Sequence, residues 1–202
     1  MQIYTNSYFL FNFKITNFTQ LRLNRLKPKK IVLIGGPATG KTTLIEAFKV
    51  RGYQCMEEIS RQITIDAQKN GVKQLFLEDP IWFSQQLLDK RKKQFFESEA
   101  LDEDVVFFDR GRPDIVAYLD YIKTDFGKLF IAACENHKYD EVFILPPWKK
   151  IHKTDNERYE SFEQLMIIHE YLEKWYHRFG YNLIEVAPGA VEDRIEFILN
   201  SL

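Results

Sequence analysis

IVLIGGPATGKTT, residues 31–43, is the stretch of this sequence that decides the fold. Its first four residues form a solid apolar run, which is typical of a strand buried on both faces of a parallel sheet. The next residues match the pattern G-x-x-x-x-G-K-(S/T) in full, and a helical pattern follows from Lys41. An apolar strand, this loop and a helix in succession predict a phosphate-binding loop.

The chemistry of such a loop follows from its glycines. They let the backbone curl so that its N–H groups point at phosphate oxygens, and the next helix adds the positive end of its dipole. We expect Lys41 to reach the β- and γ-phosphates and the Thr42 hydroxyl to bind Mg2+. The residues expected to hold the nucleotide are Gly35, Gly36, Pro37, Ala38, Thr39, Gly40, Lys41, Thr42 and Thr43. The alternative is an ordinary glycine-rich turn with a solvated lysine, and the flanking strand and helix argue against it.

Short apolar strands alternate with helical patterns along the rest of the chain, which predicts a parallel sheet wrapped by crossover helices. The expected strands are residues 31–34, 53–56, 105–108, 141–145 and 182–186. The expected helices are residues 41–50, 59–69, 80–99, 113–123, 126–136, 161–179 and 191–199. Because ligands of open parallel sheets bind at the carboxyl ends of the strands, polar residues directly after each strand are candidates for function.

Composition narrows the class of protein. The chain has 202 residues, of which 45% are hydrophobic and 28% charged. This composition excludes a wholly disordered chain, and the length fits one α/β domain. No run approaches the roughly 18 consecutive apolar residues of a membrane-spanning helix. Two cysteines, Cys55 and Cys134, are too few for a disulfide framework or a four-ligand zinc site, which favours a reducing, cytoplasmic setting.

The beginning of the chain differs in charge from the rest. The formal net charge is -1, yet residues 1–30 carry six bases and no acid. We expect residues 1–29 to form a basic appendage and residues 30–202 to form the P-loop domain. An edge strand, a disordered leader, upstream sequence read from a wrong start codon and a transit peptide are alternatives. An arm that binds nucleic acid or membrane is another, although nucleic acid is not the partner that we expect.

Asp109 ends the third expected strand, where a carboxylate would lie beside the phosphate loop. We assign it to Mg2+, directly or through water, with a helix N-cap as the alternative. Arg110 follows, and its charge could stabilise the charge that develops in phosphoryl transfer. The alternative for Arg110 is an ion pair with Glu57 or Glu58. Arg112 is expected to be a solvated residue at the start of a helix.

Glu57 and Glu58 end the second expected strand, and one of them could accept the proton of a substrate hydroxyl. We favour Glu58, and Glu57 stays open. The alternative is that at least one of them only interacts with the N-terminus of the next helix through its dipole. Arg61, one turn into that helix, could bind the acceptor.

Residues 146–158, PPWKKIHKTDNER, form a polar and basic loop before a long helix, as a lid over the phosphates would. The planar fork of Arg158 suits the γ-phosphate, and a solvated charge cluster is the alternative. Phe83 and Gln86 follow Trp82 at helical spacing and could stack on and read a base, with core packing as the alternative.

Several of these motifs occur together: residues 35–43, Glu57-Glu58-x-x-Arg61, Asp109-Arg110-Gly111-x-Pro113-Asp114, Pro146-Pro147-Trp148 and Pro188-Gly189. Together they resemble the AAA-type P-loop domain shared by the nicotinamide riboside kinase part of a bacterial NAD regulator and an animal GTP-binding trafficking protein. Many bacterial predicted ATPases look similar. The resemblance covers about residues 30–200.

The resemblance implies a fold similar to nucleoside and nucleoside-monophosphate kinases, with a five-stranded parallel sheet in the order 2-3-1-4-5 and a lid. It also implies that the loop around residues 187–191, with Pro188 and Gly189, holds the purine. In the more distantly similar deoxynucleoside kinases, a Glu after the second strand is the base and an acid–Arg pair after the third is functional. Those roles map to Glu58 or Glu57 and to Asp109 with Arg110.

The sequence therefore predicts an Mg2+-dependent, ATP-binding kinase that phosphorylates a nucleoside-like hydroxyl of a small-molecule acceptor. The substrate of the riboside kinase is not carried over, because these 202 residues contain no adenylyltransferase domain. A nucleotide switch or regulatory ATPase or GTPase acting through a protein partner is the alternative, and a binding module without turnover is a third. ATP is favoured over GTP, because NHKYD at residues 136–140 has the wrong spacing for a guanine-reading motif.

Overall fold

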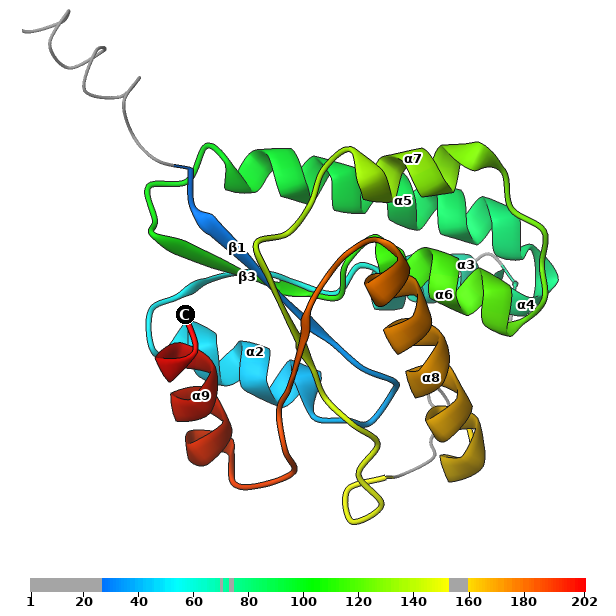
Figure 1. Ribbon diagram of the computed structural model, residues 1–202. Helices are drawn as coiled ribbons and strands as arrows, with labels where there is room; N and C mark the ends of the chain where they lie inside the picture. The colour runs from blue at the N-terminus through cyan, green and yellow to red at the C-terminus, as the bar shows by residue number, and fades with distance from the viewer. Residues whose placement is uncertain (1–26, 70, 73–74, 153–159) are drawn as a thin grey trace, which may run out of the picture.

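A computed structural model gives the structure of the protein and describes residues 27–69, 71–72, 75–152 and 160–202. Within these residues, five strands form one parallel sheet in the order β2-β3-β1-β4-β5. The strands are β1 (Lys29–Ile34), β2 (Gln54–Met56), β3 (Val105–Asp109), β4 (Glu141–Ile144) and β5 (Leu183–Glu185). The strand β1 lies in the centre, paired with β3 on one side and β4 on the other (Figure 1).

Helices cover both faces of the sheet (Figure 1). On one face lie α2 (Lys41–Val50) and α9 (Val191–Asn200), which share an apolar core with alternate strand residues such as Leu33 and Phe107. The other core contains residues of the remaining helices and the strand residues between, such as Val32 and Phe108. Those helices are α3 (Ser60–Lys69), α4 (Leu75–Glu78), α5 (Pro80–Ser98), α6 (Pro113–Tyr121), α7 (Lys128–Glu135) and α8 (Phe162–Arg178). Burial on both faces explains the solid apolar runs in the strand sequences.

The predicted fold class and the strand order implied by the resemblance are both confirmed. Each predicted strand and helix is present, with ends that differ by no more than a few residues. The four-residue helix α4 was not predicted, because a single turn is too short to show a periodic pattern. Among the described helices, none has the length and apolar character needed to cross a bilayer.

Two predicted segments lie partly outside the described residues. Residues 1–26 of the predicted appendage are outside, and β1 begins at Lys29, so the last residue of that appendage belongs to the sheet. Residues 153–158 of the predicted lid are also outside, and they include Arg158.

The prediction that Arg112 is solvated is wrong. Its side chain is 1% exposed, and its guanidinium carbon lies 4.4 Å from the ring centroid of Phe95 and 5.4 Å from that of Tyr139. The guanidinium also donates a hydrogen bond to the carbonyl oxygen of His137. A cation held over aromatic faces can be buried without a carboxylate partner, and here it joins the start of α6 to α5 and to the segment before β4.

Candidate active site

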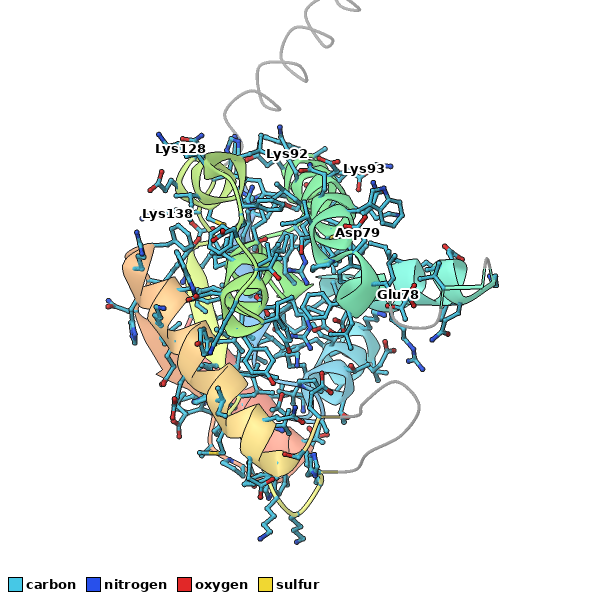
Figure 2. The ribbon with its side chains drawn as sticks, turned by 90° about the vertical axis from the view of Figure 1, so that its right-hand side faces the viewer. Glu78, Asp79, Lys92, Lys93, Lys128 and Lys138 are labelled. Carbon is cyan, nitrogen blue, oxygen red and sulfur yellow. The ribbon has the colours of Figure 1, made fainter. Side chains whose placement is uncertain are left out.

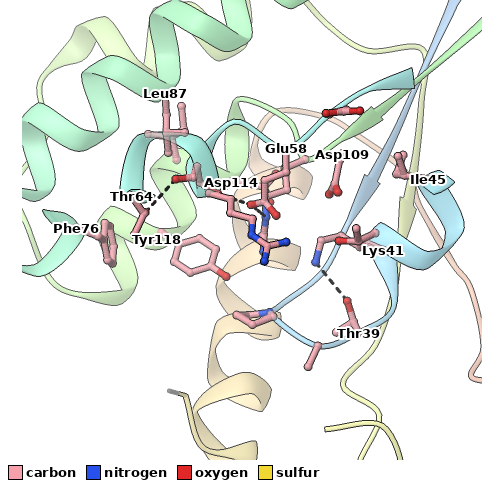
Figure 3. A pocket seen from close by; sticks show the side chains of 18 of the residues that line it. Thr39, Lys41, Ile45, Glu58, Thr64, Phe76, Leu87, Asp109, Asp114 and Tyr118 are labelled. Carbon is pink, nitrogen blue, oxygen red and sulfur yellow. Dashed lines mark hydrogen bonds and ion pairs between the residues drawn. The ribbon is translucent and has the colours of Figure 1, made fainter. Parts of the chain in front are cut away.

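A cavity of about 630 Å³ lies at the carboxyl ends of the strands (Figure 3). The phosphate loop lines one part of it, and the residues after β2 and β3 line another. Side chains from α2, α3, α4, α5 and α6, together with Ile151 and Glu160, form the remaining walls. The cavity therefore lies where ligands of open parallel sheets bind.

The phosphate loop wraps around Lys41. The Nζ of Lys41 donates to the carbonyl oxygens of Gly35 and Gly36, at 2.8 Å each. Gly35 has φ +146°, and a Cβ there would lie 2.6 Å from the carbonyl oxygen of Leu145, so only glycine fits. Burial, together with repulsion from Arg110, lowers the pKa of Lys41 from 10.5 to about 8. An anion bound in the loop would stabilise the charged lysine.

Asp109 ends β3, next to Leu33 of β1, and is 4% exposed. Its Oδ1 is buried and has no hydrogen-bond partner among the described residues. Burial and the nearby charge of Glu58 raise the pKa of Asp109 from 3.8 to about 6. An unpaired buried carboxylate oxygen and the exposed hydroxyl-bearing side chain of Thr42 fit Mg2+, which takes oxygen ligands from one or two protein groups and from substrate phosphates. The N-cap alternative for Asp109 does not hold, because Arg112 is the N-cap of α6.

Glu58 and Arg110 form an ion pair inside the cavity, with Nε of Arg110 2.6 Å from Oε1 of Glu58. Arg110 also donates to the carbonyl oxygen of Gly35 at 3.1 Å, which brings it to the phosphate loop. Burial raises the pKa of Glu58, but the charges of Arg110 and Lys41 outweigh it, and the pKa falls to about 2. Glu58 is therefore a carboxylate at neutral pH.

Glu57 also borders the cavity, but its side chain has different surroundings. It is 71% exposed and forms an ion pair with Lys49 of α2. Both glutamates follow the end of β2, but only Glu58 pairs with Arg110. The geometry thus favours Glu58 as the acid that faces a substrate.

The end of the cavity far from the phosphate loop is mostly apolar. Its aromatic walls come from Phe76, Phe83 and Tyr118, and the rings of Phe76 and Phe83 meet edge to face at 5.6 Å. Arg61 lines the cavity, as the sequence predicts. Phe83 is both a core residue and part of the wall, while Gln86 is not among the described residues that line the cavity. Pro188 and Gly189 are also not among those lining residues.

Asp114 and Tyr176 support the site, and the sequence analysis gave neither of them a role, although Asp114 belongs to one of the motifs of the resemblance. Asp114 is buried in α6, and its Oδ2 accepts hydrogen bonds from the backbone N–H of Gly111 at 2.9 Å and from the Tyr176 hydroxyl at 2.6 Å. Its Oδ1 lies 3.4 Å from Nη1 of Arg110. Asp114 lies in the first turn of α6, and its place in the motif at residues 109–114 was the signal available in the sequence.

A phosphate loop at the carboxyl edge of a 2-3-1-4-5 parallel sheet, with acids after β2 and β3, defines a P-loop protein with the fold of nucleoside and nucleotide kinases. A family model described as an AAA domain matches residues 30–194. The chain belongs to this family. A comparison with curated proteins finds no match.

Solved structures share this fold. Deoxyadenosine kinase from M. mycoides with bound dATP has a TM-score of 0.61 and 20% identity, covering 85% of this chain and 98% of that chain. Thymidylate kinase from Candida albicans has a TM-score of 0.64 and 15% identity, covering 87% of this chain and 91% of that chain. NadR protein in complex with NR has a TM-score of 0.66 and 16% identity, covering 86% of this chain and 50% of that chain. At these identities the likeness concerns the fold alone.

Proposed function

We propose that the protein is an Mg2+-dependent kinase that transfers the γ-phosphoryl group of ATP to a hydroxyl group of a nucleoside-like small molecule. One observation carries the proposal: Lys41, the buried carboxylate of Asp109 and the Glu58–Arg110 pair all face the same cavity. A phosphate-binding loop alone binds a nucleotide, whereas phosphoryl transfer also needs a metal anchor and a group that prepares the nucleophile.

The nucleotide side consists of the loop and its metal ligands. The loop N–H groups and Lys41 would bind the β- and γ-phosphates, and Thr42 and Asp109 would hold Mg2+. Mg2+ held there would neutralise the negative charge that develops on the phosphates during transfer. Binding would also remove two unfavourable features of the free protein, the buried charge of Lys41 and the unpaired oxygen of Asp109.

The acceptor side favours a neutral compound with a flat ring. The rings of Phe76, Phe83 and Tyr118 offer faces and edges against which such a ring packs. Besides Lys41, the cations that line the described cavity are Arg61, Arg91 and Arg110, and each already has an interaction partner. Arg110 pairs with Glu58 and Asp114, and Nη1 of Arg91 donates to the carbonyl oxygen of Gly111 at 2.5 Å. These contacts support a nucleoside-like acceptor rather than a nucleoside monophosphate.

The proposed step forms a bond between the acceptor hydroxyl oxygen and the γ-phosphorus and breaks the bond from that phosphorus to the β-phosphate oxygen, so ADP leaves. The hydroxyl proton passes to the Glu58 carboxylate. Because the pKa of Glu58 is about 2, the carboxylate is a weak base, and we expect it to orient the hydroxyl first and to take the proton late. Arg110 lies beside it and would stabilise the charge on the transferred group.

The test is a screen of the purified protein against nucleosides in the presence of ATP and Mg2+, read as ADP release and as a phosphorylated product. Glu58→Gln and Glu57→Gln form a matched pair. We expect Glu58→Gln to lower kcat by about 100-fold or more, the usual contribution of a positioned general base, at unchanged ATP affinity. Glu57→Gln should stay within a few fold of the unsubstituted protein.

Other outcomes separate the alternatives. Slow ATP hydrolysis that no acceptor accelerates would favour a nucleotide switch over a kinase. If neither glutamate substitution changes turnover, Glu58 is not the base. If calorimetry of the folded protein shows no heat with ATP or GTP and Mg2+, the proposed function is wrong.

A further inference from the structure

Arg194 of α9 lies against the phosphate loop, although 155 positions separate it from Thr39. Its side chain is 5% exposed, and its Nη2 donates to the carbonyl oxygen of Thr39 at 3.3 Å. A Cβ placed on Gly40 would lie only 2.9 Å from its Nη1, so the guanidinium touches the loop backbone. The C-terminal helix therefore delivers a cation to the loop that we expect to hold phosphates.

The charge of Arg194 has no counter-charge within the part of the chain that the structure describes. None of the carboxylates described forms an ion pair with it, and burial lowers its pKa with no acid acting in the other direction. The Nε is buried without a hydrogen-bond partner. The ring of Trp148, with its centroid 5.9 Å from the guanidinium carbon, offsets part of the lost hydration.

A buried cation without an anion is costly, because it loses its hydration. The other buried arginines have closer partners. Arg110 pairs with Glu58 at 2.6 Å, and the guanidinium carbon of Arg112 lies 4.4 Å from the ring centroid of Phe95. Arg194 has only the ring of Trp148 at 5.9 Å and a 3.3 Å hydrogen bond to the Thr39 carbonyl, and it lies beside the loop where the proposed ligand would bring a triphosphate. An anionic ligand there would supply the missing counter-charge.

We propose that Arg194 is a further nucleotide-binding residue, whose guanidinium binds a phosphate oxygen of the nucleoside triphosphate held by residues 35–43. This inference rests on the proposed nucleotide binding and extends it to a residue outside the loop motif. The planar guanidinium suits phosphate oxygens and stays charged when partly buried, which a lysine does less well.

The experiment uses the full chain with Mg2+ and two probes, ATP and inorganic tripolyphosphate, followed by calorimetry. Arg194→Gln keeps a donor for the Thr39 carbonyl but removes the charge, and Arg194→Lys restores the charge without the planar fork. The matched control is Arg178→Gln, because Arg178 of α8 is an exposed arginine whose guanidinium carbon lies 4.8 Å from the Trp175 ring. Thermal unfolding of each free protein is recorded alongside.

We expect Arg194→Gln to weaken the binding of both probes by about 10- to 100-fold, which is the range for a lost hydrogen bond to a charged group. The thermal midpoint of the free protein should not fall. Arg194→Lys should recover part of the affinity, and Arg178→Gln should bind as the unsubstituted protein does. If Arg194→Gln does not fold, Arg194→Met, which keeps an apolar stem without the charge, takes its place, and phosphate affinity equal to that of the unsubstituted protein would overturn the inference.

The remaining outcomes are distinct. If the unsubstituted protein binds neither probe, the proposed function fails, and the inference with it. If it binds both and Arg194→Gln binds them equally well, only the role of Arg194 is overturned. If Arg194→Gln binds ATP more weakly but binds tripolyphosphate as before, Arg194 contacts the nucleoside part of ATP, and the proposed phosphate contact is overturned. If the affinity for both probes falls only together with the thermal midpoint, and Arg194→Lys behaves the same way, Arg194 only stabilises the fold, and the inference is overturned.

Discussion

Asp109 illustrates a conflict between stability and proposed chemistry within one residue. Its carboxylate is buried, one oxygen has no partner, and the charge of Glu58 repels it. In the free protein the charged form is therefore disfavoured, which is why its pKa rises to about 6. A buried, unpaired carboxylate does not stabilise the fold, so stability does not explain why Asp109 occupies this position. A bound Mg2+ would stabilise the charged form of the carboxylate.

This argument predicts how stability depends on pH. Asp109 binds its proton more tightly when folded than when unfolded, so its contribution to stability falls as pH rises from about 4 to about 6 and stays unfavourable above. We expect Asp109→Asn to stabilise the metal-free protein at pH 7 by about 3 kcal/mol, since its pKa rises from 3.8 to about 6 and one pKa unit corresponds to about 1.4 kcal/mol. Urea unfolding at pH 4.5 and pH 7 checks this, because the gain should shrink at the lower pH.

The same substitution should abolish the extra stabilisation that Mg2+ and ATP give. Asp125→Asn serves as the control, because Asp125 is an exposed aspartate. A less stable Asp109→Asn protein at pH 7 would show that the carboxylate has a stabilising partner, and the magnesium assignment would lose its physical basis.

Local sequence was enough to place some site residues but not others. Lys41 and Asp109 could be predicted, because each follows an apolar strand directly and a parallel sheet brings strand ends together. The choice between Glu57 and Glu58 stayed open, because it depends on which of the two adjacent side chains meets Arg110, a residue distant in sequence. Arg112 was placed wrongly, because its aromatic neighbours Phe95 and Tyr139 are distant in sequence.

At the scale of elements, α6 and α8 are joined through the carboxylate of Asp114. Arg110 has φ +74°, a left-handed conformation that costs a non-glycine residue about 1 kcal/mol or more and needs support from its surroundings. Asp114 gives that support through the N–H of Gly111, and the Tyr176 hydroxyl of α8 holds Asp114 in place. A Cβ on Gly111 would lie 2.4 Å from that hydroxyl oxygen, so the two helices and the turn fit closely.

We therefore expect Tyr176→Phe, which removes one buried hydrogen bond to a charged acceptor, to lower the free energy of unfolding by about 1.5 to 3 kcal/mol. It should also lower kcat several fold with little change in ATP affinity, because it loosens Arg110 and not the phosphate loop. Tyr171→Phe on the same helix is the control, since Tyr171 is only half-buried and contacts Tyr121 through its ring. Equal effects of the two substitutions would contradict this role for Tyr176.

The helices themselves were predictable because their ends carry local signals. Asp79, labelled in Figure 2, caps α5 by accepting a hydrogen bond from the N–H of Trp82, and Pro80 lies in the first turn of the helix. Ser161 and Gln164 form a capping box at the start of α8. Such contacts span three residues and can be read from sequence. The strand order could not be read in this way, because it depends on pairings between distant segments, and it came from the family resemblance.

At the scale of the whole molecule, the boundary of the domain can be tested at the start of β1. Lys29 donates its N–H to the carbonyl oxygen of Asp104 at 2.8 Å, and Lys30 donates its N–H to the carboxylate of Asp140 at 2.7 Å. Lys30 is also buried, with its ammonium 4.7 Å from the ring centroid of Phe95. Both residues thus belong to the central strand, although the charge pattern groups them with the basic segment before it.

Two deletions separate the appendage from the domain. Removal of residues 1–26 keeps both hydrogen bonds, so we expect cooperative urea unfolding within about 0.5 kcal/mol of the full chain, as for changes away from the folded core. Removal of residues 1–30 loses both bonds and the contact with Phe95, and should cost about 2 kcal/mol or more, since each buried hydrogen bond contributes about 1 kcal/mol. Equal destabilisation by both deletions would mean that residues 1–26 are part of the folded domain, and the predicted appendage would be wrong.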